Sequence, residues 1–109
     1  MRLTFEASEY EQWQVLSVSG EVDVATAPSL SDRFDQLIAA GHAHIAVDLA
    51  GVEFMDSTGL RVLVTAARAL MPEGRLAVVA ARPNVLKIFH LTSLGEVMAL
   101  CETRESLPG

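Results

Sequence analysis

The sequence is poor in the features that mark membrane, disulfide-bonded and nucleic-acid-binding proteins. Its single cysteine, Cys101, excludes an internal disulfide and a zinc site built from cysteines. No run approaches the ~20 consecutive apolar residues that a membrane-spanning helix needs, and charged Arg2 and Glu6 come too early for a signal peptide. With 8 basic against 14 acidic side chains, the net charge of −6 argues against binding to a phosphate backbone. We therefore expect a cytoplasmic protein that neither inserts into a membrane nor binds nucleic acid.

Loops and ligand series that hold cofactors are also missing. Neither the Gly-x-x-x-x-Gly-Lys-Ser loop nor the Gly-x-Gly-x-x-Gly fingerprint occurs. Strand ends could bring together the carboxylates of Glu21, Asp23, Asp48 and Asp56, but Asp48 precedes Asp56 by 8 residues and should lie apart. Two or three carboxylates without a spaced ligand series are a weak signal for a divalent cation. The sequence predicts no cofactor and no metal.

The residues that are present suit one globular domain over residues 1–109, since the 109 residues are 50% hydrophobic. Apolar alternation and short apolar runs predict strands at residues 2–7, 13–19, 44–49, 76–80 and 97–100. Helical spacing predicts a helix capped by Thr26 and ended by Gly41, a second over residues 58–71, a third from Pro83, and a fraying helical turn in residues 102–109. Because helices separate most strands, we expect an α/β fold with packed helices and a mixed, mostly parallel sheet that starts with an antiparallel hairpin.

The stretch from Val52 to Leu60 places a serine between a strand and a helix start. Asp56, Ser57 and Thr58 are all residue types that cap helix N-termini, and the helix behind them has an apolar stripe with Arg61 on the opposite face. Unpaired backbone N–H groups and the positive end of the helix dipole would favour a negative group added to Ser57. Ser57 is therefore a candidate for regulatory phosphorylation. A plain helix cap is the alternative.

The strand followed by Asp-Ser-Thr-Gly-Leu at residues 56–60 resembles the signature of the STAS domain, named for sulfate transporters and anti-sigma-factor antagonists. The run Gly20-Glu21-Val22-Asp23 before residues 25–28 resembles the family's entry to its first helix, so the resemblance covers nearly the whole chain. It implies an anti-sigma-factor antagonist whose unphosphorylated form binds an anti-sigma-factor serine kinase and releases a sigma factor. It also implies that this kinase phosphorylates Ser57 and that a protein phosphatase is a further partner. The alternative within the family is a non-phosphorylated subunit that docks on the ATPase of a membrane transport complex.

The same resemblance implies a partner-binding surface around the serine. Its members would be the following residues: Asp23, Asp56, Ser57, Thr58, Gly59 and Arg61. Glycine costs about 1 kcal/mol in a helix interior relative to alanine, so Gly59 needs an explanation. We expect its missing side chain to let the backbone of a partner approach Ser57 closely.

A serine hydrolase is the enzymatic alternative, with Ser57, His90 and Asp56 as candidate catalytic residues. The spacing gives it little support. No Gly-x-Ser-x-Gly elbow occurs, and His42 and His44 precede a strand whose far end leads to the serine. His90 falls late in its helix, where a solvated or capping histidine is expected. The sequence therefore predicts a binding protein and not an enzyme.

Overall fold

The computed structural model describes residues 2–90 and 97–108. Within these residues, five strands form one sheet in the order β1-β2-β3-β4-β5. The strands are β1 (Thr4–Tyr10), β2 (Trp13–Val22), β3 (His44–Met55), β4 (Arg75–Val79) and β5 (Met98–Cys101). The helices are α1 (Ala27–Ala39), α2 (Ser57–Leu70) and α3 (Pro83–His90), with a 3-10 turn, η2, at Arg104–Ser106. Only β1 and β2 pair antiparallel, which confirms the expected mixed sheet with an N-terminal hairpin.

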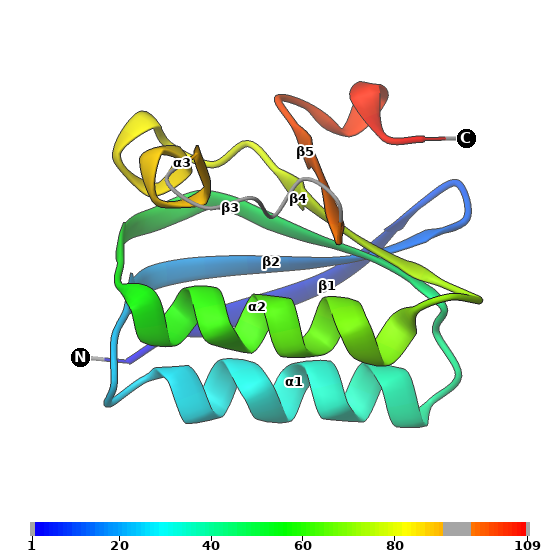
Figure 1. Cartoon of the computed structure of the whole chain (residues 1–109), viewed down its shortest axis with the longest axis horizontal. Coiled ribbons are helices and arrows are strands. Elements are labelled where there is room, and N and C mark those ends of the chain that lie inside the picture. The colour runs from blue at the N-terminus through cyan, green and yellow to red at the C-terminus, as the bar shows by residue number, and fades with distance from the viewer. Residues whose placement is uncertain (1, 91–96, 109) are drawn as a thin grey trace.

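The sheet buries its two faces in different ways. Helices α1 and α2 lie side by side along one face, and the C-terminal segment crosses the other (Figure 1). The larger core lies on the helical side and includes Leu30 and Phe34 of α1, Leu63 of α2, and Val85 and Phe89 of α3. Helices α1 and α2 each contribute one apolar stripe to this core, because their apolar side chains recur at helical spacing.

The second face of the sheet carries a smaller cluster around Trp13, which is only 2% exposed. The Trp13 indole Nε1 donates to the carbonyl oxygen of Pro108 at 2.9 Å, and Leu107 packs against the cluster. The short helical turn expected in residues 102–109 is present as η2, but the segment packs on the sheet instead of fraying. Trp13 is therefore a core residue of this second cluster.

Strand β3 is the largest departure from the sequence prediction. The sequence predicts a strand that ends at residue 49, whereas β3 continues to Met55. The longer partner strand β2, which runs to Val22 instead of residue 19, explains the difference: the two strands stay paired through two register shifts. Gly51 pairs with Ser19 of β2, and the position needs a glycine because a side chain there would overlap the Ser19 hydroxyl. Strand β1 also begins and ends later than predicted, because the hairpin turn needs only Glu11 and Gln12.

Candidate functional site

The serine lies at the edge where β2 and β3 end. Val22 pairs with Met55 in parallel register, and the Asp56 backbone N–H donates to the Val22 carbonyl at 3.1 Å. Because both strands end together, Asp23 and Asp56 follow them at the same edge of the sheet. The chain then enters α1 behind Asp23 and α2 behind Asp56.

Asp56 is the N-cap of α2. Its backbone is extended, and its Oδ1 accepts hydrogen bonds from the backbone N–H groups of Thr58 at 2.9 Å and Gly59 at 3.4 Å. The Thr58 hydroxyl also donates to this oxygen. That hydroxyl is the main reason why the pKa of Asp56 is lowered, and the backbone N–H groups add to the effect while desolvation opposes it. Asp56 therefore holds a negative charge at the helix start.

Asp23 orders the neighbouring loop that leads to α1. Its Oδ1 accepts from the backbone N–H groups of Ala25 at 2.9 Å and Thr26 at 3.1 Å. Thr26 occupies the N-cap position of α1, but the prediction that its side chain caps the helix is wrong. Its buried hydroxyl instead donates to the Glu21 carbonyl at 2.7 Å, which ties the loop to the end of β2.

Ser57 is the first residue of α2, and its side chain is exposed. Within residues 2–90 and 97–108 its hydroxyl has no hydrogen-bond partner, because Asp56 already caps the helix. The alternative role of Ser57 as a cap is therefore wrong. The hydroxyl is left available at the N-terminus of α2, where the helix dipole favours a negative charge.

Two of the predicted partner-binding residues, Arg61 and Gly59, differ in their exposure to solvent. Arg61 is exposed one turn into α2, as expected. Gly59 is buried, and a side chain there would lie 2.6 Å from Val22 Cγ1 and 2.8 Å from Met55 Cγ. The prediction that its missing side chain opens Ser57 to a partner is wrong. Gly59 instead lets α2 pack closely on β2 and β3.

Two exposed apolar side chains at this edge escaped the sequence analysis. Val24 follows Asp23 and is 74% exposed, and Phe54 precedes the Met55–Asp56 pair and is 47% exposed. Phe54 was missed because the predicted strand ended at residue 49, so nothing indicated that this side chain would lie on the outside of a strand. Large exposed apolar side chains beside a polar site are typical of protein-binding surfaces.

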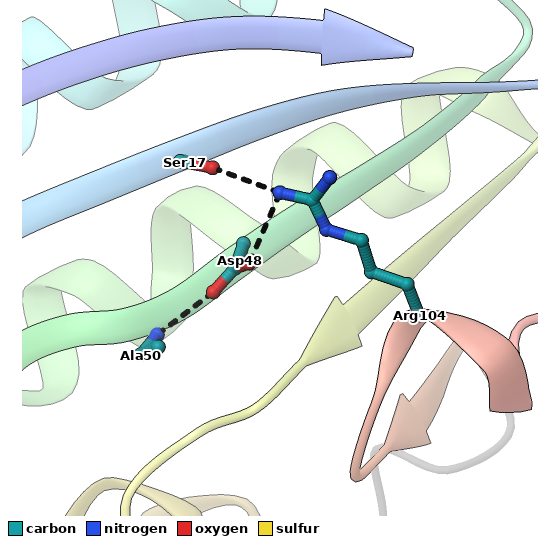
Figure 2. A network of polar contacts seen from close by, with 4 residues as sticks. All are labelled: Ser17, Asp48, Ala50 and Arg104. Carbon is teal, nitrogen blue, oxygen red and sulfur yellow. Dashed lines mark hydrogen bonds and ion pairs between the residues drawn. The ribbon is translucent and has the colours of Figure 1, made fainter. Parts of the chain in front are cut away.

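The acidic residue Asp48 lies apart from this edge, as predicted. It sits in the middle of β3, where its carboxylate pairs with Arg104 at 3.4 Å and accepts from the Ala50 backbone N–H at 2.9 Å (Figure 2). The same guanidinium reaches the Ser17 hydroxyl at 3.5 Å, so the network holds the C-terminal segment on the sheet. Among the described residues no group of three or more His, Cys, Asp or Glu side chains is arranged to hold a metal ion.

The histidines do not form a catalytic arrangement with Ser57. His44 begins β3, the strand whose other end leads to the serine, and its ring meets Trp13 edge to face with centroids 5.4 Å apart. His90 is exposed at the end of α3. In the described part of the chain, no base accepts a hydrogen bond from Ser57, so a nucleophilic role has no support in this geometry.

No helix among these residues is both long enough and apolar enough to span a membrane.

Comparison with known proteins identifies the family. The model described as "Mlab, STAS domain" matches residues 5–102. The chain belongs to the STAS family. The anti-sigma-B factor antagonist of Staphylococcus epidermidis is 30% identical over 106 residues, which are 96% of this chain and 98% of that protein.

Solved structures of anti-sigma factor antagonists share this fold. An anti-sigma factor antagonist from Mycobacterium paratuberculosis aligns with a TM-score of 0.86 and 33% identity, covering 94% of this chain and 88% of that one. The anti-sigma factor antagonist SpoIIAA in its unphosphorylated form aligns with a TM-score of 0.76 and 25% identity, covering 94% and 90%. The STAS domain predicted from the Asp-Ser-Thr-Gly-Leu segment is therefore confirmed, together with its fold.

Proposed function

We propose that this protein is an anti-sigma-factor antagonist that works by binding and not by catalysis. Its unphosphorylated form binds an anti-sigma-factor serine kinase, which then releases its sigma factor, and phosphorylation of Ser57 ends the complex. The observation that carries this proposal is the exposed Ser57 hydroxyl, which has no structural duty at the start of α2 because Asp56 caps the helix. The relatives named as antagonists support the same function.

The charges around Ser57 explain how phosphate would act as a switch. A phosphoserine adds about −1.5 to −2 charges at neutral pH. It would stand next to Asp56, whose lowered pKa keeps it ionised, and at the same sheet edge as Asp23. The helix N-terminus offsets part of this charge, so we expect the fold to persist. The acidic edge and a partner surface fitted to a hydroxyl then both disfavour the phosphorylated complex.

The partner-binding surface that we propose combines Asp23, Asp56, Thr58 and Arg61 with the two exposed apolar side chains. Phe54 and Val24 flank the acidic residues, so they would bury apolar area when a partner covers Ser57. Gly59 supports this surface from below by its packing. We expect the partner to present apolar side chains to Phe54 and Val24.

Phosphorylation mapping tests the proposal directly. The purified protein would be incubated with ATP and the anti-sigma-factor kinase from the same genome, and the product digested for peptide mass spectrometry. One phosphate on Ser57 is expected, and Ser57→Ala should accept none. Thr58 is the matched decoy, because its hydroxyl is engaged by Asp56. Phosphate on Thr58 with Ser57 unmodified would refute the site, and docking on a transporter ATPase without phosphorylation would support the alternative.

Substitution of the apolar side chains tests the surface separately. Phe54→Ser should weaken the kinase complex by about 2 kcal/mol or more if the ring is a central contact. Met71→Ser is the matched control, because Met71 is 44% exposed but follows the far end of α2. Equal binding by both variants would place the docking surface elsewhere, even if Ser57 is phosphorylated.

A further inference from the structure

A cleft of about 640 Å³ opens at the carboxyl ends of β4 and β5, beside α3. Its walls come from the residues that follow β4, from the end of β5 and from one side of α3. None of the residues around Ser57 contributes to it. A volume of this size lies within the range of small-molecule binding sites, about 300–1,000 Å³.

The walls of the cleft are mostly apolar. Leu86 of α3 and Leu100 of β5 are both half-buried, and Pro83 adds a rigid ring at the start of α3. Cys101 also contributes to the lining, while its thiol donates to the carbonyl oxygen of Ser106 at 3.7 Å in the C-terminal segment. An apolar body of several carbon atoms could therefore exchange water for carbon contacts here.

One cationic group at the cleft is held in position by the fold. The Arg82 Nε donates to the carbonyl oxygen of Ala50 on β3 at 2.9 Å, which orients the plane of the guanidinium. Across residues 2–90 and 97–108, Arg82 forms no ion pair, so its terminal nitrogens remain available as a planar pair of donors. Such a fork matches a carboxylate or phosphate. The other ionisable side chains of the lining, His90 and Glu102, are exposed and solvated.

The backbone next to Arg82 has an uncommon conformation. Ala80 lines the cleft with φ of 60°, in the left-handed region that a non-glycine residue seldom adopts. Its N–H donates to the Cys101 carbonyl at 3.0 Å, which holds the end of β4 against β5. After this turn the chain continues through Arg82 into α3.

We propose that the cleft between β4, β5 and α3 binds a small amphipathic anion, with its carboxylate or phosphate on Arg82 and its apolar body against Leu86 and Leu100. This site is separate from the Ser57 surface, so it would give the protein a second input that does not depend on phosphorylation. The proposal does not rest on the function argued above.

Nuclear magnetic resonance titration of the full chain tests the proposal with defined probes. Octanoate, added below its micelle concentration, should shift the amide signals of Ala80, Arg82, Leu86 and Leu100 in a saturable way. Octyl phosphate should do the same if the site accepts either head group, whereas binding of octanoate alone would restrict the class to carboxylates. Octylammonium and inorganic phosphate should each bind at least fivefold more weakly, because the first has the wrong charge and the second has no apolar body.

Two variants and one control complete the test. Arg82→Gln should weaken octanoate about fivefold, as expected for a solvent-exposed ion pair, and Arg68→Gln on the outer face of α2 should leave it unchanged. Leu86→Glu should abolish binding, with its folding checked by thermal unfolding. Equal affinity of octanoate and octylammonium, equal affinity of the Arg82 variant and the native protein, or saturable shifts that lie outside the cleft would overturn the proposal.

Discussion

Asp56 caps α2 and Ser57 does not, so substitutions at the two positions should differ in their effect on stability. Asp56→Ala removes the oxygen that accepts two backbone N–H groups at the start of α2, at 2.9 and 3.4 Å. Loss of an N-cap costs about 0.5–2 kcal/mol, typically about 1 kcal/mol. For a domain of this size, a loss of about 1 kcal/mol corresponds to a fall in Tm of about 4–8 °C. Ser57→Ala removes no hydrogen bond from an exposed position and should change the free energy of unfolding by less than about 0.5 kcal/mol.

The pH dependence of the same pair distinguishes capping from other causes. The pKa of Asp56 is lowered in the folded state, chiefly by the Thr58 hydroxyl. The stabilisation that the Asp56 carboxylate gives the fold is therefore complete above the pKa of the unfolded state, about 4, and is lost as the pH falls through the pKa of the folded state. The gap in Tm between Asp56→Ala and the native protein should narrow in acid, while the effect of Ser57→Ala stays constant.

Differential scanning calorimetry at pH 7 and pH 3 measures both effects. Ser29→Ala is the matched control, because Ser29 is an exposed serine in the first turn of α1 without a side-chain hydrogen bond among the described residues. The reasoning fails if Ser57→Ala destabilises the protein as much as Asp56→Ala. That result would mean that Ser57 caps the helix and is not free for a partner.

Three further outcomes follow from the geometry. Gly59→Ala should destabilise the fold by about 1–3 kcal/mol in chemical denaturation, because the added carbon would meet side chains of β2 and β3 within 3 Å; an unchanged midpoint would contradict the close packing. Arg61→Glu should weaken the kinase complex far more than Arg68→Glu in a binding assay, because only Arg61 lies within one turn of the proposed surface; a larger effect at Arg68 would move the docking face along α2. Arg104→Ala should shift the fluorescence of the single tryptophan, Trp13, toward that of a solvated indole. The loss of stability should not exceed about 1 kcal/mol, because the ion pair between Arg104 and Asp48 of β3 is partly exposed. An unchanged spectrum would show that the C-terminal segment stays in place without the Arg104 side chain.

The sequence predicted the order and type of the main helices and strands because the apolar periodicity that marks each of them lies within that helix or strand. The stripe of α2 recurs at helical spacing, and the hairpin strands alternate, so neither needed knowledge of the rest of the chain. The extension of β3 could not be predicted in this way. Gly51 is a loop signal when taken alone, and only the pairing with β2 makes it a strand residue.

The geometry around Ser57 was predicted in outline but not in detail for a similar reason. Three consecutive residues could each cap α2, and only the backbone shows that Asp56 is extended while Ser57 is already helical. The reason for Gly59 lies in Val22, a residue distant in sequence. Phe54 was missed because a register shift in the β2–β3 pair lies next to it, so the simple alternation that would mark an outward side chain is interrupted.

Titration calorimetry with the anti-sigma-factor kinase tests the central claim most directly. The native protein, Ser57→Ala and the protein phosphorylated at Ser57 would be titrated into the same kinase preparation without ATP. We predict equal affinity for the native protein and Ser57→Ala, because the exposed hydroxyl is the only group removed, and an affinity at least tenfold lower for the phosphorylated protein. Undiminished binding of the phosphorylated protein would contradict the account, because Ser57 would then be no switch.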